Sequence, residues 1–162
     1  MKLILLLLSL LSFNAVASCT AFDFNQRNVL QRAYDYGVEY DMGWSLAAIA
    51  WKESSAGRNM ANWNDPSVGV FHNLLKSVAK REGVYGNEEK EVILIVRLMH
   101  EFEFSAKHAV LELKYWQKQY GKDWRKIWSS YNAGWNWFNG IKYSDDIANK
   151  IQYLKRNKCI KV

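Results

Sequence analysis

Glu53 is the residue of this sequence whose surroundings best suit acid–base chemistry. It ends an apolar segment in which Leu46 and Ile49 precede it at helical spacing. A carboxylate in the apolar stripe of a buried helix is unfavourable unless it is protonated or paired. Burial and the C-terminal end of the helix dipole both favour the neutral acid, which predicts a raised pKa. The alternative is a structural glutamate that pairs with Lys52 or Arg58 at the surface.

A neutral carboxylic acid of this kind can protonate the leaving oxygen when a glycosidic bond breaks. A polar stretch rich in Asn, Ser and Gly follows over residues 54–65, where a cleft could open beside Glu53. The sequence has no nucleophile elbow, phosphate loop or dinucleotide fingerprint, so it carries no motif for a serine hydrolase or a nucleotide-binding enzyme. His100 and His108 have no cysteine or acidic cluster around them, so we expect no metal and no cofactor.

Helices are expected to position Glu53, since only one proline occurs in 162 residues and no stretch alternates between polar and apolar side chains. There is no internal repeat or linker. The prediction is an all-α fold, a single helical domain whose central buried helix ends at Glu53. The expected helices cover residues 25–36, 43–53 with Asp41 as cap, 73–81, 88–119 as one or two helices, 123–130, and 144–157 with Ser144 as cap, while 131–140 form a loop.

The first residues indicate export. A basic start is followed by a leucine-rich core and then by small residues up to Ala17, which is the order of a secretory signal peptide. The apolar run is too short to span a bilayer. We therefore assign residues 1–18 to a signal peptide and residues 19–162 to the domain, and expect the protein in the periplasm or cell envelope.

The two cysteines allow two interpretations. Residues 16–19 resemble a bacterial lipobox, which would place a lipid on Cys19. Alternatively, Cys19 and Cys159 form a disulfide that joins the two ends of the exported domain. The disulfide is favoured because lipidation would leave Cys159 as an odd thiol. Closing so long a loop would stabilise the fold by roughly 4 kcal/mol.

The chain carries a formal charge of +6, and loss of Lys2 with the signal peptide leaves +5. Such a surface suits polyanions, including the acidic polymers of a cell wall. Export makes nucleic acid the least expected partner, and we expect none.

Three segments resemble the soluble lytic transglycosylases, a family related to goose-type lysozymes. Residues 51–55 (WKESS) are similar to its Glu-Ser motif, residues 69–72 (GVFH) to its Gly-Leu-Met-Gln segment, and residues 130–134 (SYNAG) to its Ala-Tyr-Asn-Ala-Gly segment. Their order and separations agree, and the resemblance spans roughly residues 40–155. It implies a lysozyme-like helical fold and cleavage of the β-1,4 bond between MurNAc and GlcNAc in peptidoglycan. No water is consumed, and the product carries a 1,6-anhydro end.

The resemblance also implies roles for individual residues. Glu53 is the single catalytic acid and base, because the N-acetyl group of the substrate replaces a second carboxylate. Tyr131 should lie over the cleft, with its hydroxyl within reach of Glu53 or the sugar. The sequence departs from the family at His72, which replaces glutamine, and at Ile147, which stands where a tyrosine is frequent. The expected substrate-binding residues are Ser54, Gly69, Val70, Phe71, His72, Tyr131 and Asn132.

Two other functions fit the same residues. A hydrolytic muramidase of goose type would use Glu53 as acid and a water held by Asp65 or another carboxylate. A catalytically silent wall-binding domain would keep the fold alone. In each case the partner is the peptidoglycan glycan strand, bound by a monomer in secretion, conjugation, phage passage or wall turnover. Trp63, Trp135 and Trp137, in predicted loops, are candidates for stacking on sugar rings.

Overall fold

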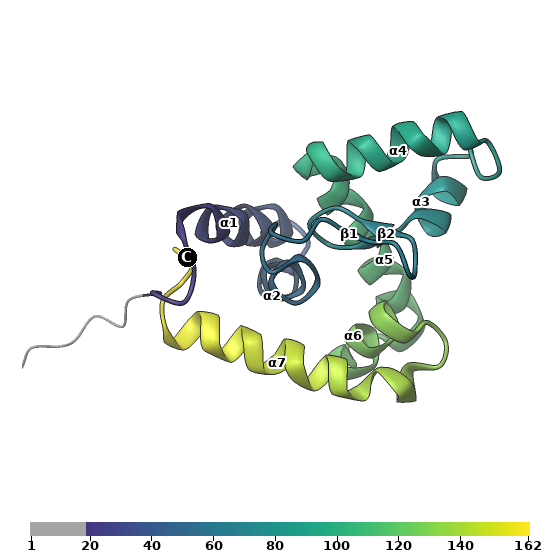
Figure 1. Cartoon of the computed structure of the whole chain (residues 1–162). Helices are drawn as coiled ribbons and strands as arrows, with labels where there is room; N and C mark the ends of the chain where they lie inside the picture. The colour runs from purple at the N-terminus through teal and green to yellow at the C-terminus, as the bar shows by residue number, and fades with distance from the viewer. Residues whose placement is uncertain (1–18) are drawn as a thin grey trace, which may run out of the picture.

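The computed structural model describes residues 19–162, so the predicted signal peptide lies outside the described residues (Figure 1). The described chain is largely α-helical, as predicted. No helix within residues 19–162 has the length and apolar character needed to cross a bilayer. The helices are α1 (Phe24–Val38), α2 (Gly43–Ser54), α3 (Leu75–Arg81), α4 (Glu88–His100), α5 (Phe102–Tyr120), α6 (Trp124–Ala133), the 3-10 helix η1 (Trp137–Gly140) and α7 (Ile141–Arg156).

A small antiparallel sheet is the part of the fold that the all-α prediction missed. Its strands β1 (Ala61–Asn62), β2 (Ser67–Val68) and β3 (Asn73–Leu74) pair in sequence order. Ala61 lies opposite Val68, and Val68 lies opposite Asn73. Strands of two residues are too short to produce an alternating pattern in the sequence. The pairing of β3 also explains why α3 begins at Leu75 rather than at residue 73.

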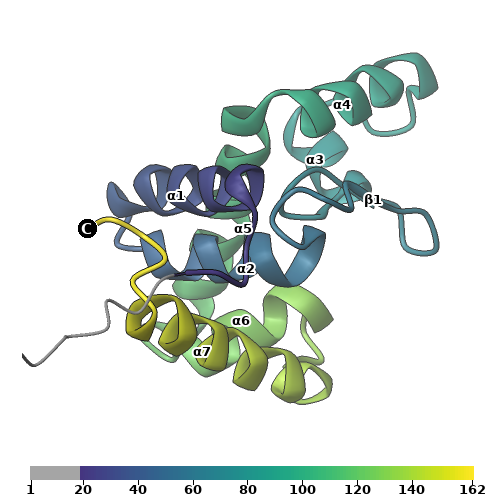
Figure 2. The same ribbon diagram turned by 60° about the vertical axis from the view of Figure 1, so that its left-hand side comes forward.

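Helix α2 lies at the centre of the helical layers, with α1 on one side and α6 and α7 on the other (Figure 2). Leu46 and Ile49 are fully buried in the main core, as the periodicity predicted. The predicted cap is wrong. Asp41 has a left-handed backbone (φ 57°), and Met42 takes the N-cap position without a side-chain hydrogen bond.

The segment 88–119 forms two helices, one of the two predicted alternatives, because Glu101 has an extended backbone between α4 and α5. Two further boundaries differ from the prediction. Helix α6 continues to Ala133, so residues 131–133 are helical rather than part of a loop. Helix α7 begins at Ile141, and the Ser144 hydroxyl donates to the Ile141 carbonyl (2.9 Å) within the first turn rather than capping the helix.

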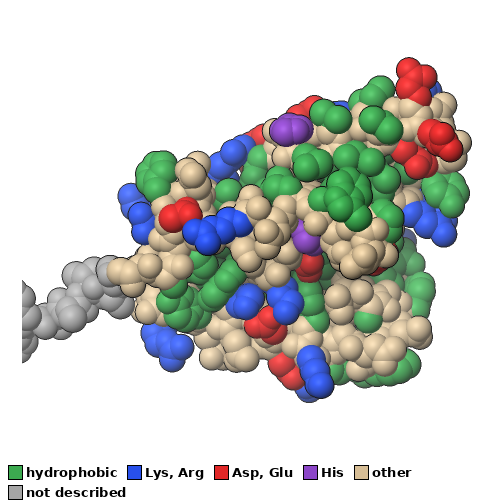
Figure 3. All heavy atoms as spheres, in the orientation of Figure 1, with side chains coloured by type: hydrophobic (Ala, Val, Ile, Leu, Met, Phe, Trp, Pro, Cys, Tyr) green, Lys and Arg blue, Asp and Glu red, His purple; other side chains and the backbone are tan. Residues whose placement is uncertain are grey.

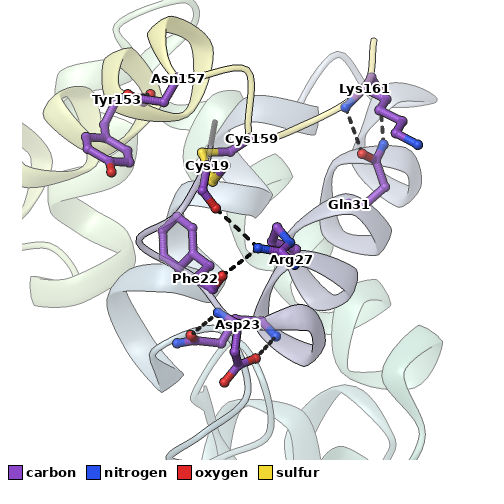
Figure 4. Close-up of a disulfide and its surroundings, with 10 residues drawn as sticks. Cys19, Phe22, Asp23, Arg27, Gln31, Tyr153, Asn157, Cys159 and Lys161 are labelled. Carbon is purple, nitrogen blue, oxygen red and sulfur yellow. Dashed lines mark hydrogen bonds between the residues drawn. A yellow bond between two sulfur atoms is a disulfide. The ribbon is translucent and has the colours of Figure 1, made fainter. Parts of the chain in front are cut away.

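The two ends of the described chain are joined by a disulfide between Cys19 and Cys159, whose Cα atoms are 4.9 Å apart. Figure 4 shows the bond beside the start of α1, where Arg27 donates to the carbonyls of Phe22 (2.8 Å) and Cys19 (3.3 Å). The predicted disulfide is therefore present. Because it uses the Cys19 sulfur, it contradicts the lipid alternative.

Candidate active site

Glu53 occupies the last turn of α2, one residue before the helix ends. The turn that follows is held by Ser54, whose hydroxyl donates to the Ala50 carbonyl (3.0 Å) and accepts from the Gly57 amide (2.8 Å). Ser55 then takes a left-handed backbone (φ 51°) and ends the helix. Because Ser54 is fully buried with its hydroxyl engaged, the predicted contact with substrate is inconsistent with its position.

The Glu53 carboxylate has two close polar neighbours. Tyr143 donates its hydroxyl to Oε1 (2.5 Å), and Nδ1 of His72 lies 3.6 Å from Oε2. The Glu53 side chain is 18 % exposed, so the group is mostly removed from water yet still open to it. In Figure 3 a histidine and acidic atoms meet at the surface near the middle of this face, with basic side chains just below.

The alternative of a surface ion pair is wrong for Glu53. Lys52 pairs with Asp146 (2.7 Å), and Arg58 pairs with Asp23 (2.7 Å). Both basic side chains that the sequence offered as partners are therefore engaged elsewhere. The carboxylate is left with a tyrosine and a histidine beside it.

Desolvation raises the pKa of Glu53, as predicted, and it is the largest effect on this group. The hydrogen bond from Tyr143, the charge of Lys52 and the charge that His72 carries when protonated lower the pKa, but they do not offset the burial. Burial and the nearby Glu53 charge also raise the pKa of both Tyr131 and Tyr143 well above the usual range. Both phenols therefore remain protonated donors at neutral pH.

His72 turns toward Glu53 through an unusual local backbone, with φ 43°. Its Nε2 lies 2.8 Å from the Asn59 carbonyl, which can only accept a hydrogen bond. The Nε2 atom must therefore carry a proton, and a neutral imidazole presents the lone pair of Nδ1 to Glu53. His72 therefore lies beside Glu53, and its contact with substrate stays a prediction.

The three residues before His72 serve packing. Val70 and Phe71 are buried, and Phe71 packs against Phe102 with ring centroids 5.7 Å apart. Gly69 has φ 86°, and a Cβ there would lie 2.3 Å from the Leu98 carbonyl oxygen. Its small size allows close approach to α4 rather than to a ligand. The predicted substrate contacts of Gly69, Val70 and Phe71 are therefore not consistent with where their side chains lie.

Tyr131 connects α6 to the segment that carries His72. Its hydroxyl donates to the Phe71 carbonyl (2.9 Å), so it does not bond to Glu53 as one alternative predicted. Asn132 is exposed, and it lines a pocket of about 210 Å³ together with His72 and Tyr131. The pocket continues from these residues toward Arg81.

Sequence reasoning missed Tyr143, the closest polar partner of Glu53. The resemblance places Ile147 where the family often has a tyrosine, but Ile147 is fully buried. Tyr143 lies four residues earlier, on the same face of α7. The signal was hidden because the predicted helix began at Ser144, one residue after Tyr143, whereas α7 begins at Ile141.

The loop tryptophans and the second acid do not line this pocket. Trp63 and Trp135 are mostly exposed, and Trp135 packs edge-on against Trp116 (5.1 Å). Trp137 lies under the Lys126 amine (5.1 Å). Asp65 is exposed beside a different pocket. Between residues 19 and 162, no group of three or more His, Cys, Asp or Glu side chains is arranged to hold a metal ion.

Comparison with known proteins finds one informative relative. The chain is 31 % identical, over 175 aligned residues, to a protein of Enterobacteria phage T4 described as an uncharacterized 20.7 kDa protein in the vs-regB intergenic region. The alignment covers 97 % of this chain and 96 % of the phage protein. No family model matches the chain, and no solved structure matches it.

Proposed function

The chain belongs to the family of this phage T4 protein, and we propose that it is a lytic transglycosylase of peptidoglycan with Glu53 as its single acid and base. The proposal includes a lysozyme-like arrangement of the helices around α2. It also includes export to the periplasm or cell envelope, which the disulfide favours. The phage relative favours phage passage among the predicted contexts.

The observation that carries the proposal is the convergence of three segments that are distant in the sequence. Glu53 ends α2, His72 lies 3.6 Å from it, and Tyr131 bonds to the residue before His72. These are the three segments on which the resemblance to lytic transglycosylases rests. A mostly buried carboxyl group with a raised pKa, open at one side, suits a group that must give and then recover a proton.

The proposed reaction proceeds in two steps. Glu53 first donates its proton to the leaving GlcNAc oxygen as the bond from the anomeric carbon of MurNAc breaks. The N-acetyl group of the same MurNAc stabilises the positive charge. The 6-hydroxyl oxygen then bonds to the anomeric carbon, and its proton returns to the Glu53 carboxylate. Tyr143 holds Oε1 throughout, so Oε2 is the oxygen available for proton transfer.

The surroundings of Glu53 favour this reaction over hydrolysis. The groups that shift its pKa are a tyrosine, a histidine and a lysine, with no second carboxylate among them. Asp65, which the muramidase alternative would need, is exposed beside a separate pocket. An inverting hydrolase requires a second carboxylate to activate water, whereas an intramolecular attack does not.

Mass spectrometry of digested sacculi tests the proposal. Purified sacculi are incubated with the exported domain, and the muropeptide ends are identified. We expect 1,6-anhydro ends, each lighter by one water than a reducing end. Reducing ends alone would assign the chain to the muramidases. If a folded Glu53→Gln variant cleared sacculi as well as wild type, Glu53 would have no catalytic role.

A further inference from the structure

A second pocket lies at the opposite end of α2 from Glu53. It has a volume of about 420 Å³ and is lined by α1, by the first turn of α2, and by α6 and α7. Trp44 and Glu53 are separated along the helix by about 14 Å at the usual rise per residue. Figure 2 shows α2 between α1 and the pair α6 and α7, so this pocket and the Glu53 site share one central helix.

The walls of this pocket are aromatic. Trp44, Trp124, Trp128 and Tyr34 all line it, and each of the four is partly exposed. The rings of Trp124 and Trp128 are tilted by 35° with centroids 5.7 Å apart. Tyr34 meets Trp44 edge-on at 4.8 Å. The three tryptophans therefore present part of their ring surface to the hollow.

Polar groups are placed between and around the rings. The Trp128 indole donates to the hydroxyl of Ser45 (3.0 Å), a residue that is only 5 % exposed. Asp41 and Lys155 stand exposed at the rim. No side chain caps α2 here, so the first backbone N–H groups of the helix have no side-chain acceptor. The pocket therefore offers flat apolar faces together with both donors and acceptors.

We propose that this pocket is a second binding site for a glycan strand built of N-acetylglucosamine units. A pyranose ring has an apolar face that stacks on an aromatic ring, and its hydroxyl and amide groups require donors and acceptors at the rim. The one carboxylate and the one amine at the rim suit a neutral ligand rather than an ion. Lys155 already lies over the Trp44 ring at 5.0 Å, where a cationic ligand such as choline would have to bind.

Such a site would hold the insoluble wall polymer while the Glu53 site acts on it. Binding one strand at two places raises the effective concentration of the second site. This consequence depends on the proposed function, but glycan binding itself does not need the chemistry of Glu53. The two claims can therefore fail separately.

Titration of chitotriose into the Glu53→Gln domain tests the site, with the indole N–H signals of the eight tryptophans followed by NMR. We expect saturable shifts of the Trp44, Trp124 and Trp128 signals. Trp124→Leu should weaken the affinity reported by Trp44 and Trp128 by about tenfold, which corresponds to the loss of one stacked ring. Trp63→Leu is the matched control, because Trp63 lies between β1 and β2 outside this pocket, and it should leave both shifts unchanged.

Two results would overturn the site. One is that none of the three indole signals moves at tens of millimolar chitotriose. The other is that choline, rather than chitotriose, shifts them. Because the three signals are read in a folded domain, the test stands even where Trp124→Leu is too unstable to study.

Activity measurements separate this proposal from that of the Glu53 site. If the pocket binds glycan, Trp124→Leu should slow the clearing of insoluble sacculi several-fold and leave the cleavage of short soluble glycans unchanged. Indole shifts without any Glu53-dependent cleavage would retain the site and reject the enzyme. Glu53-dependent cleavage without indole shifts would retain the proposed enzyme and reject the glycan-binding pocket.

Discussion

Glu53 and His108 are both ionisable groups held largely out of water, yet their surroundings differ. Desolvation is the largest effect on each, and it favours the neutral form in both cases. It raises the pKa of Glu53 and lowers the pKa of His108 to about 4. Glu53 keeps an 18 % exposed side chain and a hydrogen bond from Tyr143. His108 is fully buried.

The contacts of His108 are those of a core residue. Its ring meets Phe104 edge-on at 4.6 Å, and neither ring nitrogen has a hydrogen-bond partner. Glu82 Oε1 is 3.2 Å from Nε2, but the two groups lack hydrogen-bond geometry and Lys107 also binds that oxygen. A perturbed pKa therefore does not identify a working group by itself. Access to solvent and a directed partner distinguish Glu53 from His108.

The largest predicted effect is on catalysis. Glu53→Gln should lower the rate of sacculus clearing by about 1,000-fold or more, because it removes the only proton donor of the proposed reaction. His108→Gln is the matched control, and it should keep activity close to wild type in the folded protein. A comparable loss in both variants would remove the distinction between the two groups.

The second prediction concerns Tyr143, which donates a hydrogen bond to Glu53, whereas His108 has no such partner. Tyr143→Phe should lower activity by about 10- to 100-fold, the range for a hydrogen bond to a charged group. The Tyr143 hydroxyl lowers the pKa of Glu53, so its loss should raise that pKa further. Protonated Glu53 begins the reaction, and the alkaline limb of the pH–rate profile should therefore move to higher pH.

Tyr131→Phe is the control for this shift. The Tyr131 hydroxyl donates to the Phe71 carbonyl rather than to Glu53. The variant should lose stability without moving the alkaline limb. An alkaline limb that stays in place in Tyr143→Phe would show that Glu53 does not set it.

The third prediction concerns stability in acid. The pKa of His108 is lowered from 6.5 to about 4 in the fold, so its neutral form stabilises the native state above pH 6.5. This contribution is lost as the pH falls, by about 3 kcal/mol between pH 6.5 and 4. His108→Leu lacks this group, so its free energy of unfolding should not fall in this way. As the pH is lowered from 6.5 to 4, urea denaturation should show wild type losing about 3 kcal/mol relative to the variant. Parallel curves for the two proteins would contradict it.

The smallest predicted effect is the pH dependence of stability that Glu53 causes. Its sign is opposite to that of His108, because the pKa of Glu53 is raised whereas that of His108 is lowered. A raised pKa means that Glu53 stabilises the fold below its ordinary pKa of 4.5 and that this stability is lost as the pH rises through its folded pKa. Glu53→Gln stays neutral, so its Tm should exceed that of wild type by a few degrees at pH 8. The difference should disappear below pH 4.5. A lower Tm at pH 8 would mean that the carboxylate is well solvated or paired.

Features that depend on local pattern could be predicted from the amino-acid sequence. Apolar spacing near 3.6 residues was sufficient to predict α2 as the buried helix and to place Glu53 at its end. Two cysteines near the ends of the predicted domain were sufficient to favour their pairing over lipidation of Cys19. The resemblance placed His72 and Tyr131 near the same site, although it assigned substrate contacts to Ser54 and to residues 69–71 that their packing does not support.

Contacts between distant segments depend on the folded chain and could not be predicted from local pattern. Tyr143 reaches Glu53 across 90 residues of sequence, and its hydrogen bond depends on the path of α7 rather than on any local motif. The three short strands and the pocket at the N-terminal end of α2 likewise arise from contacts between distant segments. Periodicity reports which face of an element is buried, whereas the partner on that face is set by the packing of the whole chain.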